Sequence, residues 1–153
     1  NCINMFNEMK FASILNKVKY QQPTAMPAWQ VMRMATIDAA RAIGLEDQIG
    51  SLEPGKKADI ILIDLRSPNL MPVLTDPVRN IVPNLVFSGR GNEVIMSIID
   101  GNIIMEDRKV LTVNEDAILD EVQNMGEQMQ AFAKEGAIKA KVGTLLLTEE
   151  GYY

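Results

Sequence analysis

The sequence predicts an α/β protein in which helices, then strands, then one last helix follow one another along the chain. Three observations carry this prediction. Residues 1–45 are rich in Met and Ala and repeat apolar side chains at helical spacing. Residues 59–112 contain short apolar runs separated by Gly, Pro and Asp turns, and residues 114–135 form one long amphipathic stripe.

The first helix is expected over residues 1–20, where apolar side chains recur close to every 3.6 positions. They are Phe6, Met9, Ala12, Leu15 or Asn16, and Val18. Two prolines in residues 21–27 end this helix, and Pro27 suits the first turn of a second helix over 28–35.

A third helix is expected over residues 36–45, with Thr36 as its N-cap and Gly44 as its C-terminal stop. Helices of this composition are typical of those that pack on a larger sheet lying outside this chain. The alternative is a small helical subdomain with a core of its own.

The middle of the chain is expected to be mainly strand. Residues 58–64 form a continuous apolar run between two Asp residues, the pattern of a strand covered on both faces. Four prolines make residues 66–83 an extended crossing segment, and strands follow over 84–89 and 93–99. The sequence Asp100-Gly101-Asn102 predicts a hairpin turn, and a second polar turn follows over 106–109.

The last helix is expected over 114–136, and Thr112 and Glu115 have the spacing of a capping box at its start. Its apolar residues step by four and three along one face: Ile118, Val122, Met125, Met129 and Phe132. We expect this stripe to dock against the sheet, with a partner or a cofactor as the alternatives. The tail over 137–153 has no clear prediction, because it could pack on a neighbour or fray.

The segment GSLEPGKK, residues 50–57, resembles a phosphate-binding loop but lacks what that loop requires. Lys57 occupies the position of the hydroxyl that holds magnesium, and Pro54 removes a backbone donor. The predicted order is also helix, loop, strand, the reverse of the order that phosphate binding needs. Glu53, Pro54 and Gly55 instead predict a structural type II turn closed at Lys56.

Composition excludes several classes of function. A net charge of −5 without a basic stripe argues against a nucleic-acid partner, and the apolar runs are too short for a membrane span. The chain has no histidine and one cysteine, Cys2, so it cannot alone form a Ser-His-Asp relay, a His metal site or a thiolate zinc cluster. The paired carboxylates fall in turns or at helix starts. We therefore assign no catalytic and no metal-binding residue.

The chain starts at Asn1, without an initiator Met and directly in helix-like sequence. This start leads us to expect a piece of a longer polypeptide. Processing, or the choice of the segment expressed, would produce the same start.

Residues 34–64, and residues 49–59 position by position, resemble the C-terminal signature of the metal-dependent amidohydrolase superfamily. Residues 98–112 resemble its final hairpin. Residues 1–17 resemble a helix of the branch that contains 5-methylthioadenosine/S-adenosylhomocysteine deaminases and atrazine-chlorohydrolase-like enzymes. The resemblance covers residues 1 to about 135.

This resemblance implies the last helices of a (β/α)8 TIM-like barrel over 1–48 and part of a small composite β-sandwich domain over 49–113. A C-terminal helix over 114–136 and the tail over 137–153 would follow. The turn at Glu53, Pro54 and Gly55 would then mark the passage from barrel to sandwich, a structural role.

The resemblance also implies a chemistry. Family members hold zinc or iron through histidines and an aspartate, and a metal-bound water attacks the substrate; a metal lowers the pKa of such a water toward about 7. Every one of those ligands would precede Asn1. We therefore expect Asn1 and Asn4 at most to border the pocket, with helix capping as the favoured role of both.

The function expected from the resemblance is that of the C-terminal part of a cytoplasmic metal-dependent hydrolase of carbon–nitrogen bonds, inactive alone. Its substrate would be purine-like or another N-heterocycle. The resemblance leaves open whether the protein forms a homo-oligomer. The competing hypothesis is a non-catalytic β-domain interaction module, or a subunit that completes a barrel in trans. The helices of residues 1–45 are expected to expose apolar faces, so that the isolated chain associates.

Overall fold

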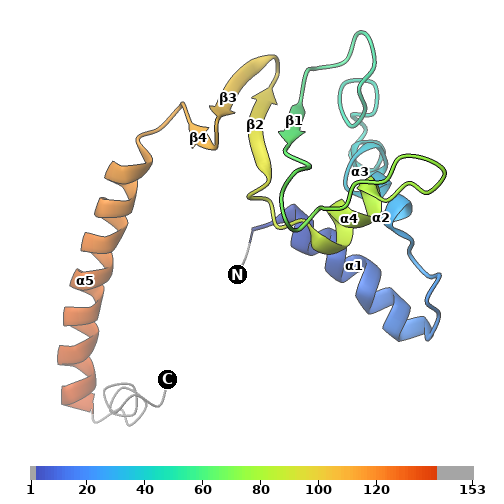
Figure 1. Cartoon of the computed structure of the whole chain (residues 1–153). Helices are drawn as coiled ribbons and strands as arrows, with labels where there is room; N and C mark the ends of the chain where they lie inside the picture. Colours follow the sequence, from blue (N-terminus) through green and yellow to red (C-terminus); the bar gives the residue numbers. More distant parts are fainter. Residues whose placement is uncertain (1–2, 141–153) are drawn as a thin grey trace. The chain divides into compact units, whose positions relative to one another are not determined.

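The computed structural model describes residues 3–140, apart from the side chains of residue 135 and of residues 137–140. It divides into two compact units, Asn1–Thr112 and Val113–Tyr153. The first unit contains four helices and a sheet among its described residues, and the second contains one long helix (Figure 1). The helical part and the sheet, which the sequence separates at residue 48, therefore lie within one compact unit.

Helix α1 spans Met5–Tyr20, within the range predicted for the first helix. The side chain of Asn4 caps it by accepting from the backbone N–H groups of Phe6 and Asn7. At the other end Gln21 takes a left-handed conformation, with φ of 49°, and its N–H and that of Gln22 donate to carbonyls of the last turn.

Helices α2 (Ala28–Met34) and α3 (Ile37–Ala42) confirm the second and third predicted helices. Gly44 ends α3 with a φ of 71°, and the N–H groups of Gly44 and Leu45 donate to Arg41 and Ala40, as in a Schellman motif. Thr36 is the N-cap residue of α3, as predicted, but its side chain makes no capping hydrogen bond. Its hydroxyl donates backward to the carbonyl of Met32 at 2.8 Å, a bond that Thr makes readily when a preceding helical turn is within reach.

Helix α4 spans Ile81–Ser88 and corrects the strand predicted over 84–89. Pro83 lies in its first turn, where a backbone N–H has no intrahelical partner to lose. The consecutive residues Leu85 and Val86 are both buried, as they would also be in a strand covered on both faces. The short apolar run is therefore compatible with a strand or a helix, and the helix forms because its residues pack against the other helices.

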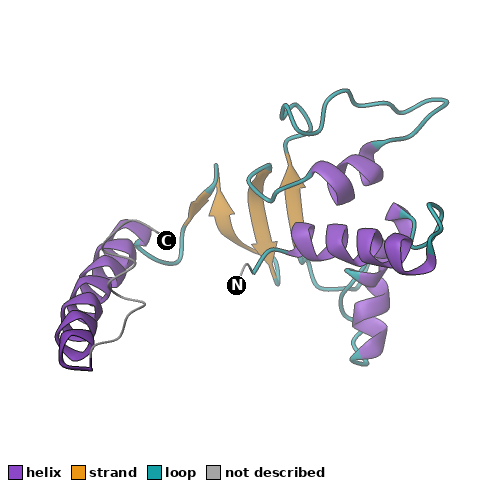
Figure 2. Ribbon diagram, turned by 90° about the horizontal axis from the view of Figure 1, so that it is seen from below, coloured by secondary structure: helices purple, strands orange, loops and turns teal. Residues whose placement is uncertain are grey.

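The four strands form one antiparallel sheet in the order β1-β2-β3-β4. They are β1 (Ile60–Ile63), β2 (Val94–Ile99), β3 (Asn102–Glu106) and β4 (Lys109–Val110). Figure 2 shows the strands side by side, with β1 and β4 at the two edges.

Two tight turns join the last three strands, and both were predicted. Asp100 and Gly101 have positive φ values of 48° and 78°, and Asp107 and Arg108 have 48° and 63°. Positive φ at both central residues is the turn geometry that matches the twist of a two-stranded hairpin.

The prediction that the first strand is covered on both faces is wrong within this chain. Ile61 is 49% exposed and Leu62 is 45% exposed. The reason is that no described element packs closely over these two side chains. Strand β1 is also an edge strand, paired on one side with β2 and with no partner strand on the other among the described residues.

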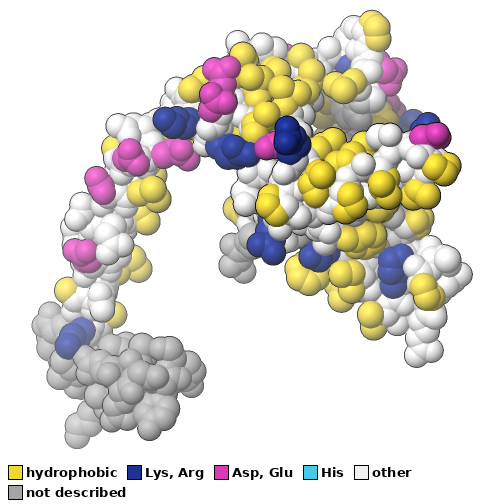
Figure 3. All heavy atoms as spheres, viewed as in Figure 1, with side chains coloured by type: hydrophobic (Ala, Val, Ile, Leu, Met, Phe, Trp, Pro, Cys, Tyr) yellow, Lys and Arg dark blue, Asp and Glu magenta, His cyan; other side chains and the backbone are white. Residues whose placement is uncertain are grey.

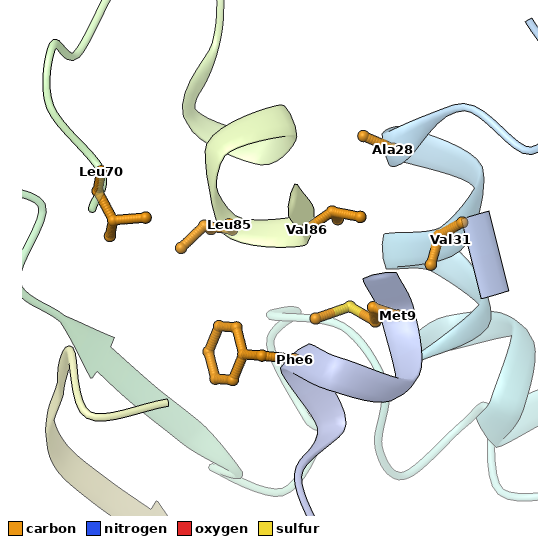
Figure 4. Packing of buried hydrophobic residues seen from close by; sticks show 7 residues of the cluster. All are labelled: Phe6, Met9, Ala28, Val31, Leu70, Leu85 and Val86. Carbon is orange, nitrogen blue, oxygen red and sulfur yellow. The ribbon is translucent and has the colours of Figure 1, made fainter. Parts of the chain in front are cut away.

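The core of the first unit lies where α1, α2 and α4 meet. Seven buried side chains form it: Phe6, Met9, Ala28, Val31, Leu70, Leu85 and Val86 (Figure 4). Leu70 comes from the crossing segment between β1 and α4, so this segment is anchored in the core although it has no helix or strand of its own.

Helices α1 and α2 also leave large apolar side chains at the surface, as predicted (Figure 3). On α1 they are Met5, Phe11, Ile14, Leu15, Val18 and Tyr20. Val18 is 69% exposed, although the sequence placed it on the same face as the buried Phe6 and Met9. The packed face of α1 is therefore narrower than its apolar face.

The second unit contains helix α5, Glu115–Ala140, which runs four residues beyond the predicted end. Asn114 caps it by accepting from the N–H of Ala117 at 3.2 Å, so the capping box between Thr112 and Glu115 is not the cap. The side chains of the predicted stripe are exposed, Phe132 at 80%. Docking of this stripe on the sheet stays a prediction, and residues 141–153 lie outside the described part. Among residues 3–140 no helix combines the length and the apolar character that crossing a membrane requires.

Candidate functional site

The start of α1 is where the sequence placed a pocket rim, at Asn1 and Asn4. Asn1 lies outside the described residues. Asn4 uses both ends of its side-chain amide: Oδ1 accepts from Phe6 N at 2.9 Å, and Nδ2 donates to the carbonyl of Arg90 at 2.6 Å. Capping, the role predicted for Asn4, is therefore combined with a long-range hydrogen bond to Arg90 that was not predicted. Its place at a pocket rim stays a prediction.

Arg90 belongs to the short loop between α4 and β2, and Glu93 organises this loop from within. Glu93 is only 2% exposed. Its Oε2 accepts from Arg90 N at 3.1 Å and Gly91 N at 2.9 Å, and its Oε1 accepts from Asn69 Nδ2 at 3.0 Å. Both oxygens of this buried carboxylate therefore have donors, which a buried charge requires.

The surroundings of Glu93 act on its pKa in opposite directions. Burial raises the pKa and is the largest single influence, but the hydrogen bonds from Asn69 and from the backbone N–H groups of Arg90, Glu93 and Gly91 together outweigh it. The pKa of Glu93 therefore lies below its ordinary value of 4.5. The hydrogen bonds of this loop therefore stabilise the charged, carboxylate form of Glu93.

Two glycines shape this loop beside α1. Gly89 allows a close approach, because a Cβ there would lie 2.8 Å from Phe6 Cδ1, and Gly91 has a φ of 98°, which side chains rarely adopt. On the far side, Arg108 Nε donates to the carbonyl of Asn92 at 2.9 Å. The loop is thus held by α1 on one side and by the turn between β3 and β4 on the other.

The predicted turn at Glu53, Pro54 and Gly55 is present. Lys56 N donates to the carbonyl of Glu53 at 3.2 Å, and Gly55 has a φ of 92°, the positive φ that a type II turn requires at its third position. Side chains reinforce it: Lys56 Nζ donates to Ser51 Oγ at 2.7 Å and lies 3.3 Å from Glu53 Oε1. Ser51 Oγ donates to Glu53 Oε1, and this hydrogen bond, followed by the hydrogen bond and charge of Lys56, lowers the pKa of Glu53.

This turn leads from α3 into β1, so the chain runs helix, loop, strand as predicted, and no helix N-terminus faces the loop. The charged groups around it are already engaged in the fold. Lys57 Nζ lies 3.6 Å from Asp100 Oδ1, and Asp59 Oδ1 accepts from Asp100 N at 2.8 Å. A phosphate-binding role therefore has no free cation or amide nest to rest on here.

A hollow of about 460 Å³ lies between α3, the loop after it and β1. Its lining is mostly apolar, with Ile43, Ile49 and Ile61 among its residues, and Lys57 and Asp59 are its charged members. Both of these bind the turn at Asp100. The hydroxyl of Ser51, which also lines the hollow, is hydrogen-bonded to Lys56 and Glu53 and so belongs to the structural turn.

The described residues of this chain do not form a metal centre. The chain has no histidine and one cysteine, and within residues 3–140 no three Asp, Glu or Cys side chains come together as ligands. Glu93 is saturated by donors rather than open to a cation. What the described residues build is a set of structural links, of which the one from Glu93 to Asn4 joins the most distant parts of the chain.

Comparison with known proteins identifies relatives for most of the chain. A family model described as the amidohydrolase family matches residues 1–104. The chain is 39% identical over 131 residues to the 5′-deoxyadenosine deaminase of Methanosarcina mazei, covering 86% of this chain and 29% of that enzyme. It is 41% identical over 123 residues to the 5-methylthioadenosine/S-adenosylhomocysteine deaminase of Syntrophobacter fumaroxidans, covering 80% and 27%.

Solved structures agree in fold. An adenosine deaminase from Xanthomonas campestris with bound zinc matches with a TM-score of 0.75 and 28% identity, over 83% of this chain and 28% of that one. Atrazine chlorohydrolase from Arthrobacter aurescens, in complex with zinc, matches with a TM-score of 0.65 and 20% identity, over 78% and 25%. The chain thus spans less than a third of the length of the relatives it matches.

Proposed function

This chain belongs to the amidohydrolase family, and from that premise we propose that it is the C-terminal part of a metal-dependent deaminase acting on an adenosine-like nucleoside. One observation carries the proposal: enzymes named as deaminases are about 40% identical over four fifths or more of this chain, while the chain spans only 27–29% of their length. The remaining length is large enough to hold the chemistry that this chain lacks.

The proposed reaction is the hydrolytic removal of an amino group from a purine-like ring, with release of ammonia. Purine-like substrates are preferred over other N-heterocycles because the relatives with the higher identity are named for adenosine derivatives. Which nucleoside is used depends on pocket side chains that this proposal places outside the chain.

The role proposed for the chain itself is structural. Residues 1–48 supply the last helices of a barrel, residues 49–113 supply part of a small β domain, and the turn at Glu53, Pro54 and Gly55 joins the two. The exposed apolar side chains of α1 and the unpaired edge of β1 support this role, because both are surfaces that a larger fold would cover.

The metal, zinc or iron, would be held entirely by the part of the protein outside this chain, because the residues here do not fit a metal site. The zinc in the Xanthomonas campestris deaminase structure supports a metal in the family. It follows that the chain alone should be inactive.

A chimaera tests the proposal. The matched C-terminal region of the Methanosarcina mazei deaminase is replaced by this chain, and ammonia release is measured from adenosine, 5′-deoxyadenosine and 5-methylthioadenosine. The controls are this chain alone and the relative truncated before the replaced region. We expect activity from the chimaera and none from either control.

Two results would contradict the proposal. Ammonia release by the purified chain alone would disprove its inactivity. A chimaera that unfolds cooperatively and contains metal, yet releases no ammonia from any of the three nucleosides, would disprove the deaminase role.

The competing hypothesis of a separate interaction module or a subunit acting in trans is decided by mass. An antibody against α5 detects the product in its native source. A species much heavier than 17.0 kDa supports a longer enzyme, and a species at 17.0 kDa supports a separate subunit.

A further inference from the structure

One peptide group links two side chains that lie at opposite ends of the first unit's sequence. The peptide between Arg90 and Gly91 accepts through its carbonyl from Asn4 Nδ2, at 2.6 Å, and donates through its N–H to Glu93 Oε2, at 2.9 Å. We propose that Glu93 is a positioning residue that fixes the start of α1 through this peptide and Asn4. The proposal rests on the proposed function in one respect: the metal-holding part would join the chain just before this point.

The first step of the argument is the direction of the hydrogen bonds. From Glu93 to the peptide, to the Asn4 amide and on to Phe6 N, each group accepts on one side and donates on the other. A charged acceptor at one end of such a row polarises every member, so each bond is stronger than it would be alone. Through this polarisation the negative charge of Glu93 strengthens the hydrogen bond at the first turn of α1.

The second step is that this end of α1 favours negative charge. The first N–H groups of a helix carry a partial positive charge and lack intrahelical partners. Asn4 is uncharged, yet its Oδ1 accepts from Phe6 N at 2.9 Å and Asn7 N at 3.3 Å. The carboxylate of Glu93 reinforces this cap from a distance, without occupying the cap position itself.

The third step is that the geometry allows little adjustment. Glu93 is buried, and its second oxygen is held by Asn69 Nδ2 at 3.0 Å. Gly91 has a φ of 98°, a conformation that other residues rarely adopt, so the backbone at this peptide is restricted to a glycine geometry. The position of Glu93 therefore determines where the peptide lies, and the peptide determines where Asn4 and the first turn of α1 lie.

The variants are chosen to separate the link from ordinary loss of stability. Glu93→Gln removes the charge and keeps the shape, and Glu93→Ala removes the whole side chain. Asn4→Asp keeps a capping oxygen but loses the donor to Arg90. Asn80 provides a matched control, because its Oδ1 accepts from Leu74 N at 2.8 Å and its Nδ2 donates to the Pro72 carbonyl at 2.8 Å; Asn80→Asp makes the same chemical change away from the link.

The test measures kcat and KM in the chimaera, together with urea unfolding of the chimaera and of the 153-residue chain. We expect Glu93→Gln and Asn4→Asp each to lower kcat by about tenfold, because small displacements of reacting groups have effects of this size, with KM within about threefold. Asn80→Asp should lower the urea midpoint and leave kcat unchanged.

The double variant Glu93→Gln with Asn4→Asp decides whether the two residues act through each other. Independent sites multiply their effects on the unfolding equilibrium constant, whereas coupled sites fall short of that product. For this pair we expect the change in the unfolding equilibrium constant to be smaller than the product of the single changes by about threefold or more. For Glu93→Gln with Asn80→Asp we expect it to equal that product.

If the double variant changes the unfolding equilibrium constant by the full product of the two single effects, the proposed link between Glu93 and Asn4 is wrong. An unchanged kcat in a folded Glu93→Gln chimaera would also contradict it. Should Glu93→Ala fail to fold, Glu93→Gln still decides. If the unsubstituted chimaera is inactive, the proposed function fails on its own, and the unfolding cycle in the 153-residue chain still decides whether Glu93 acts through Asn4.

Discussion

The ring of Phe6 lies so close to Gly89 that a methyl group at position 89 would come within 2.8 Å of Phe6 Cδ1. The same methyl group would come within 2.5 Å of the backbone carbonyl of Leu85. Gly89 follows the last residue of α4 and Phe6 lies in the first turn of α1. The absence of a side chain at position 89 therefore sets how closely these two helices approach.

Gly89→Ala should destabilise the first unit by about 2–3 kcal/mol. Gly89 has a φ of −61°, which alanine adopts freely, so the loss would come from overpacking alone. Urea unfolding followed by circular dichroism measures it. The control is Gly126→Ala in α5, where a new Cβ meets nothing within 4 Å; it should be neutral or stabilising by up to about 1 kcal/mol. Equal effects of the two substitutions would contradict the close contact.

Sequence reasoning predicted the elements whose signals are local. Helix α1 follows from its apolar spacing, the turn at Asp100 and Gly101 from the residues that accept positive φ, and the turn at Glu53 from Pro and Gly at fixed positions. Each of these depends on residues a few positions apart. The family resemblance is likewise carried by short runs of sequence, and the family match over residues 1–104 confirms it.

Sequence reasoning failed where distant partners decide. Residues 84–89 were predicted as a strand, and α4 forms there because Leu85 and Val86 pack against α1 and α2. Thr36 is the N-cap residue, as predicted, but its hydroxyl bonds to a carbonyl of the preceding turn and makes no capping hydrogen bond. Glu93 was missed altogether, since Asn69 is 24 positions away and the Asn4–Arg90 bond spans 86. The only local sign was a single carboxylate between a Gly-rich loop and an apolar strand, which by itself predicts nothing.

The two positive-φ glycines near β1 should differ in their cost of substitution. Gly55→Ala meets nothing within 4 Å, so its cost is backbone strain alone, about 1–2 kcal/mol. Gly50→Ala adds contacts of 2.8 Å with Ala40 Cβ and 2.9 Å with Ile37 Cα, so about 2–5 kcal/mol is expected. Thermal and urea unfolding of the two variants give the comparison. A Gly50→Ala variant no less stable than Gly55→Ala would show that the loop does not pack on α3.

The stability contributed by Glu93 should depend on pH in a defined direction. Its pKa is lowered by folding, so the contribution is fully present above the unfolded pKa near 4.5 and is lost as the pH falls through the lower pKa of the folded state. At pH 7 we expect Glu93→Gln to cost about 1–3 kcal/mol, the range for hydrogen bonds to a buried charged group. The free energies of unfolding of both proteins are measured from pH 7 to pH 3.

The difference between the two proteins isolates Glu93, because every other carboxyl group is common to both. It should stay constant above about pH 5 and narrow below the unfolded pKa of about 4.5. A difference that widens as the pH falls would mean that the folded protein prefers the protonated form, contrary to the hydrogen bonds around this side chain.

The isolated chain should associate and bind a hydrophobic dye, because α1 leaves Phe11, Leu15 and Val18 exposed, the last at 69%. Sedimentation velocity and dye fluorescence measure both properties. Substituting Leu15→Lys and Val18→Glu should reduce them without changing the urea midpoint, since neither side chain belongs to the core. Met129→Lys on α5 separates the contribution of the second unit. In the chimaera the surface of α1 would be covered, so the dye fluorescence per molecule should fall below that of the isolated chain. An isolated chain that is monomeric and does not increase the dye fluorescence would show that α1 needs no covering partner.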